Sequence, residues 1–274
     1  MKGRVLIIAG SDSGGGAGIQ ADIKTVTALD GYAMTAITAL TAQNTQGVHA
    51  IFEVPEDFIA RQIEVVLDDL GTDAIKIGML HRASVIHAVA DVLERMDVRV
   101  PLVLDPVMVA KGGHALLDPD AVQALVQRLL PRATLITPNV PEAEALTGIK
   151  IDTVADFGPV GDKLLALGAH AALIKGGHMP GGGEKTDSVT DVLWREGAGA
   201  KVFEAPRIDT RHTHGTGCTL ASAITCGLAQ GMDLAAAVRR AHTYVQLAIL
   251  SAPAYGGGHG PLNHAHTVVP FDAD

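Results

Sequence analysis

The residues best suited to chemistry lie in the segment His214–Thr219, which stands directly before an amphipathic helical pattern. Glycines such as Gly215 and Gly217 allow a backbone to approach a ligand closely. The first amides of a helix lack intrahelical acceptors and lie at the positive end of the helix dipole, so they can bind phosphate. A plain helix start capped by Thr216 would leave the same pattern, so both interpretations stay open on these residues alone.

Cys218 stands in the first turn of this predicted helix. A helix N-terminus lowers the pKa of a thiol, which would make Cys218 a thiolate able to act as a base or nucleophile. The alternative is a small buried hydrophobe, as most unpaired cysteines are. Cys226 follows within the same pattern, and the helical rise puts the two about 12 Å apart, too far for a disulfide. We therefore expect two reduced thiols, with Cys226 buried.

The opening loop, Gly10–Gly18, follows the first apolar run and is dense in glycine. It superficially fits a dinucleotide fingerprint, but so many glycines make the match unspecific. No Gly-Lys-Ser/Thr follows, so the loop is not a Walker A motif. A loop that closes over a small substrate fits equally well.

Two carboxylates and a lysine end apolar runs that read as strands. Asp105 ends one run, Glu142 follows another, and Lys175 ends a third. Carboxylates at neighbouring strand ends can hold Mg²⁺ for phosphoryl transfer, although Glu142 alone could be an ordinary acid in a first helical turn. A lysine that ends an apolar strand needs a partner, which favours a contact with nucleotide phosphates. The 12 histidines form no zinc-binding pattern.

The elements that must position these residues alternate between short β-branched runs and helix-length amphipathic segments, which predicts a mostly parallel sheet covered by helices. Expected strands are Arg4–Ala9, Ala74–Ile77, Val100–Asp105, Thr134–Thr137 and Ala171–Lys175. Expected helices are Ile19–Leu29, Glu56–Leu70, Ala83–Met96, Asp118–Leu130, Val154–Leu167, Thr216–Gln230 and Leu234–Leu250. Ser188–Trp194 and Lys201–Ala205 read as a hairpin at the sheet edge.

The polar loops after the strands should carry the function, because ligands of open α/β sheets bind at the carboxyl ends of strands. These loops are Gly10–Gly18, Gly78–His81, Pro106–Gly113, Pro138–Glu144 and Gly176–Lys185. No linker or internal repeat divides the chain, so we expect one domain over residues 1–274.

The composition narrows the class of protein. The chain has 274 residues, 47% of them hydrophobic but only 3% aromatic, which is enough for a large aliphatic core. A net charge of −9 argues against nucleic-acid binding. No apolar stretch approaches the roughly 18 residues that suggest a membrane span. Two widely spaced cysteines and no signal-peptide core favour a cytoplasmic protein.

Taken together, the motifs resemble the hydroxymethylpyrimidine/phosphomethylpyrimidine kinase family of thiamine biosynthesis. The likeness runs nearly end to end, and Ala-Gln-Asn-Thr combined with Gly-Thr-Gly-Cys is especially specific. The matching segments are Ile8–Asp22, Ala39–Thr45, Lys76–Leu80, Leu104–Val109, Thr137–Ala143, Lys175–His178, His214–Cys218 and Gly260–His264.

The resemblance implies a ribokinase-like three-layer αβα sandwich without a separate lid domain. It implies two ATP- and Mg²⁺-dependent phosphorylations of 4-amino-5-hydroxymethyl-2-methylpyrimidine, first to the monophosphate and then to the diphosphate. It also implies a homodimer whose partners are the aminopyrimidine and ATP, with no nucleic acid and no membrane.

The resemblance further assigns roles to particular residues. Cys218 corresponds to the base, within a catalytic set that also holds Lys175, Gly215 and Gly217. ATP is contacted by the matches to Lys175, Asn139, Thr216 and Gly217, and Mg²⁺ by those to Asp105 and Glu142, with Asn139 helping to orient it. The pyrimidine pocket corresponds to Gly10, Ala17, Asp22, Gln43, Met79 and Val107. The Gln43 amide offers a donor and an acceptor, which suits a ring nitrogen beside an exocyclic amine.

Two rival functions remain on the sequence alone. A pyridoxine/pyridoxal kinase would also bind a flat heteroaromatic ring bearing a hydroxymethyl group, and Gln43 does not exclude it. A non-catalytic module that senses the pyrimidine is a rival of another class. An intact Gly-Thr-Gly anion site beside Cys218 speaks against the sensor, which needs no machinery for ATP phosphates.

Overall fold

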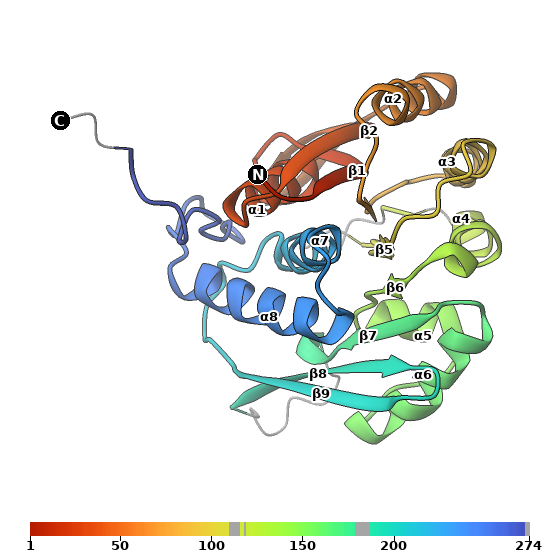
Figure 1. The fold of residues 1–274 in the computed structure, drawn as a ribbon. Coiled ribbons are helices and arrows are strands. Elements are labelled where there is room, and N and C mark those ends of the chain that lie inside the picture. Colours follow the sequence, from red (N-terminus) through yellow and green to blue (C-terminus); the bar gives the residue numbers. More distant parts are fainter. Residues whose placement is uncertain (110–115, 118, 179–186, 272–274) are drawn as a thin grey trace.

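The chain folds around one sheet, as a computed structural model that describes residues 1–109, 116–117, 119–178 and 187–271 shows (Figure 1). From one edge to the other the strands are β3 (Gly47–Glu53), β2 (Tyr32–Asn44), β1 (Arg4–Asp12), β4 (Ala74–Ile77), β5 (Leu102–Leu104), β6 (Leu135–Ile136), β7 (Ala171–Lys175), β8 (Ser188–Arg195) and β9 (Gly199–Pro206). The six strands from β2 to β7 run parallel, and both edges are antiparallel.

Helices cover both faces of the sheet (Figure 1), so the predicted three-layer αβα architecture is confirmed. One layer holds α1 (Gly18–Ala28), α7 (Thr216–Ala229) and α8 (Leu234–Leu250). The other holds α2 (Glu56–Asp69), α3 (Ala83–Arg95), α4 (Pro119–Ala124), α5 (Val140–Thr147) and α6 (Phe157–Ala166).

The core lies on both sides of the parallel strands. In β7, Ala171 and Leu173 face the helices α7 and α8, whereas Ala172 and Ile174 belong to the core on the other face. This alternation follows from the two-residue period of a strand, and it explains why the central strands read as continuous apolar runs.

Most predicted elements are confirmed, including the edge hairpin β8–β9, but three were missed and one is broken. Strands β2 and β3 were not predicted. The β2 segment, Tyr32–Asn44, is rich in Ala and Thr and shows no strong alternation of apolar and polar residues. Helix α5 was taken for part of the loop Pro138–Glu144. The expected helix Asp118–Leu130 is not a single α-helix. After α4 the chain forms a π turn, Leu125–Leu129, and then a 3₁₀ turn, Leu130–Arg132. The 3₁₀ turn contains Pro131, which cannot continue helical hydrogen bonding. Asp118 and parts of the loops Pro106–Gly113 and Gly176–Lys185 lie outside the described residues.

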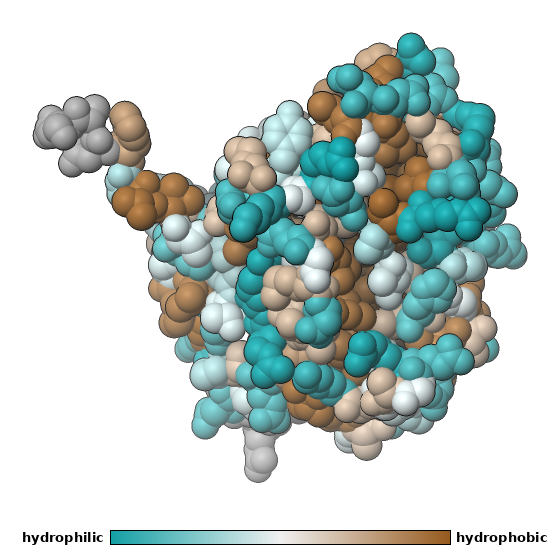
Figure 2. Space-filling model, viewed as in Figure 1, coloured by the Kyte–Doolittle hydropathy of each residue, from teal (hydrophilic) through white to brown (hydrophobic). Residues whose placement is uncertain are grey.

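Exposed apolar side chains gather at the C-terminal end of the described chain. Val269 and Phe271 are 85% and 93% exposed, on a segment that projects from the body and carries brown, hydrophobic atoms in Figure 2. None of the helices formed by the described residues is long and apolar enough to cross a membrane.

Candidate active site

The N-terminus of α7 is packed directly against the opening loop. Gly215 is the N-cap, with a left-handed φ of 84°, and a Cβ atom there would collide with the carbonyl oxygen of Gly16. Glycine is therefore required at position 215 for both reasons. Thr216 is not the cap that a plain helix start would need; it is the first helical residue, and its hydroxyl donates to the Thr213 carbonyl oxygen at 2.8 Å. The half-buried first turn is suited to an anion.

A lysine–aspartate pair lies against this helix end. Lys175 Nζ, at the end of β7, is 3.1 Å from Asp105 Oδ1. An ideal Cβ on Gly217 would be 3.3 Å from Lys175 Nζ and 3.6 Å from Asp105 Oδ2. Burial opposes the charge of Lys175, but Asp105 and Glu142 raise its pKa above the ordinary value, so the ammonium stays charged. The structure thus brings the predicted phosphate-binding residues together.

Glu142 has the capping role that its sequence context allowed, and its role as a magnesium ligand stays a prediction. It forms a capping box with Asn139 at the start of α5, in which each side chain accepts the other residue's amide, at 2.8 and 2.9 Å. Burial, aided by Asp105 and opposed by Lys175, raises the pKa of Glu142 to about 7. A carboxylate held in this way gains from a nearby cation.

The candidate magnesium ligands Asp105 and Glu142 lie in a charged environment. Asp105 and Glu142 influence each other electrostatically beside the Lys175 ammonium. The described residues contain no group of three or more side chains that could hold a metal by themselves. Two carboxylates nevertheless suit Mg²⁺, which usually takes one or two from the protein and completes its shell with water and substrate phosphates.

An apolar surface lies on the other side of the opening loop. Met79 packs in a small cluster with Ala39 and Leu116, and Val107 packs against it. An ideal Cβ on Gly10 would lie 3.2 Å from Met79 Sδ, so a glycine at position 10 allows Met79 to pack close to the opening loop. Gly10, Met79 and Val107 therefore come together as predicted.

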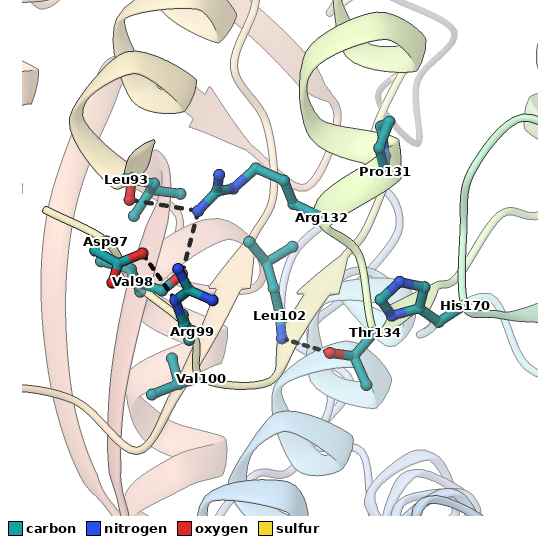
Figure 3. Close-up of a pocket in the computed structure, with 10 residues that line it drawn as sticks. All are labelled: Leu93, Asp97, Val98, Arg99, Val100, Leu102, Pro131, Arg132, Thr134 and His170. Atoms are coloured by element: carbon teal, nitrogen blue, oxygen red, sulfur yellow. Dashed lines mark hydrogen bonds and ion pairs between the residues drawn. The ribbon is translucent and has the colours of Figure 1, made fainter. Parts of the chain in front are cut away.

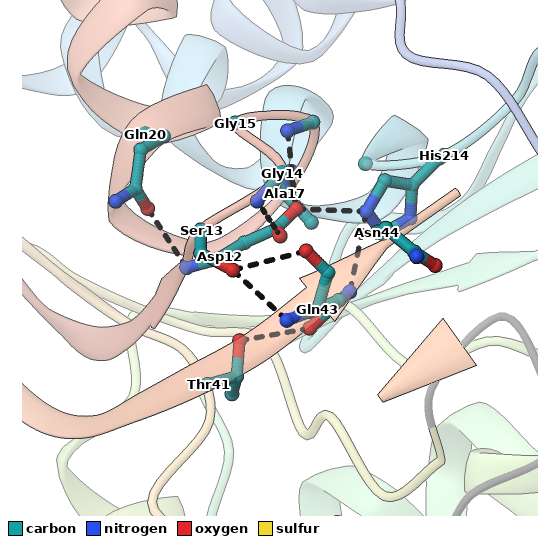
Figure 4. A network of polar contacts seen from close by, with 12 residues as sticks. Asp12, Ser13, Gly14, Gly15, Ala17, Gln20, Thr41, Gln43, Asn44 and His214 are labelled. Atoms are coloured by element: carbon teal, nitrogen blue, oxygen red, sulfur yellow. Dashed lines mark hydrogen bonds and ion pairs between the residues drawn. The ribbon is translucent and has the colours of Figure 1, made fainter. Parts of the chain in front are cut away.

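Gln43 is the penultimate residue of β2 and lies inside a polar network (Figure 4). Its side-chain amide lies 3.3 Å from His214 Nε2, and His214 Nε2 lies 2.8 Å from Asp12 Oδ2. Asp12 also accepts the Ala17 amide at 2.8 Å. The network joins the predicted pyrimidine-binding residues Gln43 and Ala17 to the segment that begins the phosphate site.

Asp22 does not line the pocket as predicted. Its side chain is fully buried, and its two oxygens accept from Lys76 Nζ at 2.8 Å and from the Ser222 hydroxyl at 2.7 Å. Ser222 is one turn beyond Cys218 on α7, so the buried pair lies beneath the site. The expected contact with substrate is corrected to a supporting position.

The expected low pKa of Cys218 is also corrected. Burial raises the pKa of its thiol to about 11, with smaller contributions from Asp22 and Asp105, although the charge of Lys76 and the Gly18 amide act in the opposite direction. Burial outweighs the nearby positive charge, and the thiol is the neutral-pH form. Cys226 is buried and unpaired, as expected.

Sequence reasoning missed four residues of this region: Asp12, Lys76, Asp191 and His214 as a network member. Lys76 is fully buried in the middle of β4, and a lysine inside the run Ala-Ile-Lys-Ile was a visible signal that a buried partner must exist. Asp191 accepts the Gly176 amide at 2.9 Å, supporting the turn after Lys175; nothing in its sequence context marked it.

A hollow of about 440 Å³ lies at the opposite end of the strands (Figure 3). Its most prominent polar group, Arg132, donates to the carbonyl oxygens of Leu93 at 3.3 Å and Val98 at 3.1 Å. These bonds satisfy one carbonyl in the last turn of α3 and one in the loop that follows it, which is a structural use of arginine. The hollow holds none of the predicted site residues.

Comparison with known proteins agrees with this geometry. The family described as phosphomethylpyrimidine kinase matches residues 12–263. The chain belongs to this family. It is 48% identical to the hydroxymethylpyrimidine/phosphomethylpyrimidine kinase of Streptomyces coelicolor, over 95% of this chain and 93% of the relative. It is 51% identical to the thiamine biosynthesis bifunctional protein ThiED of Geobacter sulfurreducens, covering 96% of this chain but only 52% of that longer relative.

Solved structures of this phosphomethylpyrimidine kinase family and its neighbours share the ribokinase-like fold. The phosphomethylpyrimidine kinase of Clostridium difficile superposes with a TM-score of 0.78 at 43% identity, covering 89% of this chain and 98% of that one. An ADP complex of Bacillus subtilis pyridoxal kinase superposes with a TM-score of 0.87 at 38% identity, covering 97% and 98%. Shape alone therefore does not separate the two activities.

Proposed function

We propose that this chain, working as a single kinase domain, transfers the γ-phosphoryl group of ATP to 4-amino-5-hydroxymethyl-2-methylpyrimidine and then phosphorylates the monophosphate to the diphosphate. The observation that carries the proposal is the meeting of Lys175, Asp105 and the first turn of α7 at Gly217. Phosphoryl transfer is catalysed mainly by positioning and charge neutralisation, and these groups can supply both.

In this proposal, separate residues of the chain bind the phosphoryl group, bind the pyrimidine and accept the proton. The α7 amides and Lys175 hold the transferred phosphoryl group, with Thr216 and Asn139 beside the nucleotide. Gln43, Gly10, Ala17, Met79 and Val107 hold the pyrimidine. Cys218 accepts the proton of the substrate hydroxyl, and because burial keeps it a thiol at neutral pH, the small ionised fraction is the active base.

A magnesium ion belongs to this proposal through Asp105 and Glu142. Bound there with the ATP phosphates, it would neutralise charge that develops during transfer. Glu142 would remain deprotonated beside the ion, which removes the unfavourable effect of burial on its charge.

The alternative is a pyridoxine/pyridoxal kinase of the same fold, favoured by the close superposition on a pyridoxal kinase. Against it stand relatives 43% to 48% identical that are named hydroxymethylpyrimidine/phosphomethylpyrimidine kinase.

The deciding experiment measures ADP release and product mass with Mg·ATP and each alcohol in turn. We expect the aminopyrimidine to yield first a monophosphate and then a diphosphate, with a lower kcat/KM for pyridoxine. A reaction that stops at the monophosphate, or that prefers pyridoxine, would contradict the proposal.

We also propose that the protein is cytoplasmic and forms a homodimer through the β2/β3 edge. Leu40 and Phe52 lie opposite each other there, 43% and 67% exposed, and burying such a pair against a second copy would stabilise a dimer. Sedimentation of the wild type and Phe52→Glu tests this: a dimer that dissociates on substitution supports it, and a wild-type monomer contradicts it.

A further inference from the structure

Asp12 fixes the protonation of His214. The Asp12 carboxylate accepts the amides of Gly14 (2.8 Å), Gly16 (3.0 Å) and Ala17 (2.8 Å) as well as contacting His214 Nε2 at 2.8 Å (Figure 4). Burial acts to raise the pKa of Asp12, but the His214 contact and the amides outweigh it and hold the pKa below its ordinary value. An ionised carboxylate can only accept, so His214 Nε2 carries a proton and donates it.

The protonated Nε2 then dictates which end of the Gln43 amide faces it. The amide nitrogen is placed 3.3 Å from His214 Nε2, which would set two donors face to face. The oxygen and nitrogen of an amide have nearly the same shape, so the hydrogen-bond network decides their assignment. The Nε2 proton is donated to Asp12 at the shorter distance, and a protonated ring nitrogen has no lone pair for the Gln43 NH₂ group. A half-turn of the amide places its oxygen beside the N–H bond, which it can share with Asp12, and removes the conflict.

Thr41 requires the same orientation from the other side. Its hydroxyl lies 2.9 Å from the Ser11 carbonyl oxygen and 3.1 Å from the other end of the Gln43 amide. A carbonyl only accepts, so the single hydroxyl proton points to Ser11, and the hydroxyl must accept from Gln43. The amide NH₂ group therefore faces Thr41.

The main chain of Gln43 is held in place independently. The Ser13 hydroxyl donates to the Gln43 carbonyl oxygen and accepts from the Gln43 amide, both at 2.9 Å. The side chain thus starts from a fixed point, and only the polarity of its terminal amide is left for His214 and Thr41 to set.

We propose that Asp12, His214 and Thr41 act as positioning residues that fix the Gln43 amide with its oxygen toward His214 and its NH₂ toward Thr41, and that this polarity selects the substrate. The inference rests on the proposed function, in which Gln43 binds the ring. The amide then offers one lone pair on the His214 side and one N–H on the Thr41 side. An exocyclic amine beside a bare ring nitrogen matches this pair of groups.

Two other rings fail to match. In the analogue whose amine is replaced by an oxo group, the adjacent ring nitrogen carries the proton, so donor and acceptor are exchanged. Pyridoxine has no amine next to its ring nitrogen and leaves the Gln43 oxygen without a donor. Buried polar groups left unpaired are the basis of strong discrimination between similar substrates.

The test compares kcat/KM for the aminopyrimidine alcohol with that for its oxo analogue. We expect wild type to prefer the amine by roughly 10²-fold, since two hydrogen bonds are mismatched. Thr41→Val and His214→Leu free the amide to turn and should each lower this ratio about tenfold, mainly through KM. Thr41→Ser, the matched control, keeps the hydroxyl and should restore the ratio.

Ratios for Thr41→Val and His214→Leu within about twofold of wild type, below the effect of one neutral hydrogen bond, would overturn the inference. A wild type that does not phosphorylate the amine would instead reject the proposed function. The ¹⁵N shifts of His214 in the wild-type protein give a check that needs no variant. We expect a proton on Nε2, and a proton on Nδ1 alone would contradict the inference.

Discussion

Two lysine–aspartate pairs of similar geometry stand close to the first turns of α7. Lys76 Nζ is 2.8 Å from Asp22, and both side chains are 0% exposed. Lys175 Nζ is 3.1 Å from Asp105, but the Lys175 side chain is 14% exposed. The first pair is sealed under Cys218 and Ser222, whereas the second lies at the open end of the strands beside Gly217.

The difference in burial indicates different roles for the two pairs. A fully buried pair has no alternative partner, so its charges are committed to each other and to the neighbouring core. A pair at the open end can exchange its partner for a phosphate or a cation without first breaking the fold. Burial acts against the charge of both lysines, and in both cases the neighbouring carboxylates more than compensate, so the pKa is raised and both remain ammonium ions.

The largest effect should come from breaking the sealed pair. Lys76→Met leaves Asp22 buried without its cation, and we expect the free energy of unfolding to fall by about 3–5 kcal/mol. Denaturant unfolding measures it. Adding Asp22→Asn removes the stranded charge and should recover most of the loss; a single variant as stable as wild type would show that the pair is not committed.

Breaking the open pair should affect catalysis more than stability. Lys175→Met removes a donor aimed at the phosphoryl group, and we expect kcat to fall by roughly 10²–10³-fold. The denaturant concentration at the unfolding midpoint should fall less than in Lys76→Met, because this pair is less completely buried, with the Lys175 side chain 14% exposed. If Lys175→Met unfolds at the same denaturant concentration as Lys76→Met, the contrast between the pairs fails.

Cys218 lies within the electrostatic influence of Lys76 and tests the region where the two pairs meet. If its ionised form is the base, kcat/KM for the alcohol step should rise about tenfold per pH unit between pH 7 and 9, below the thiol pKa of about 11. Cys218→Ser should flatten this rise and slow the alcohol step by roughly 10²-fold.

Phosphorylation of the monophosphate should be nearly insensitive to Cys218→Ser, because a phosphate monoester is already largely ionised near its second pKa of about 6. Single-turnover rates of both steps provide the control. Equal losses in the two steps would mean that Cys218 supports geometry rather than proton transfer.

The smallest effect should be at Glu142. Glu142→Gln keeps the shape but removes a carboxylate near the open pair, so the apparent Mg²⁺ requirement should rise several-fold. Thermal stability should stay close to wild type because two effects oppose each other. Removing the buried charge is favourable, whereas the capping hydrogen bond from the Asn139 amide becomes weaker. An unchanged Mg²⁺ titration would return Glu142 to a purely capping role.

The contrast between the pairs also marks the limit of sequence reasoning. Lys175 was predicted because it ends a strand before a glycine pair, a local signal. The partnership of Lys76 with Asp22 joins residues far apart along the chain, and only their packing shows that Asp22 supports the site from beneath. The pKa of Cys218 was misjudged for the same reason: the helix end is visible in the sequence, but the burial that outweighs it is not.

The remaining errors have local causes. Strand β2 carries Gln43 but is built from alanine and threonine, which give no strong strand pattern. Helix α5 begins with Asn139 and a proline at its first turn, a start signal that was available and was passed over.

The contact of Gly215 with the Gly16 carbonyl has a consequence for the evolution of such chains. Two loops far apart along the chain fit each other with no room for a side chain at Gly215. A hybrid gene that joins the first half of one relative to the second half of another must inherit two loops already shaped for each other. We expect functional hybrids to tolerate changes throughout the intervening helices, whereas a backbone shift in either loop would have to arise together with its counterpart, so the two loops should behave as one heritable unit.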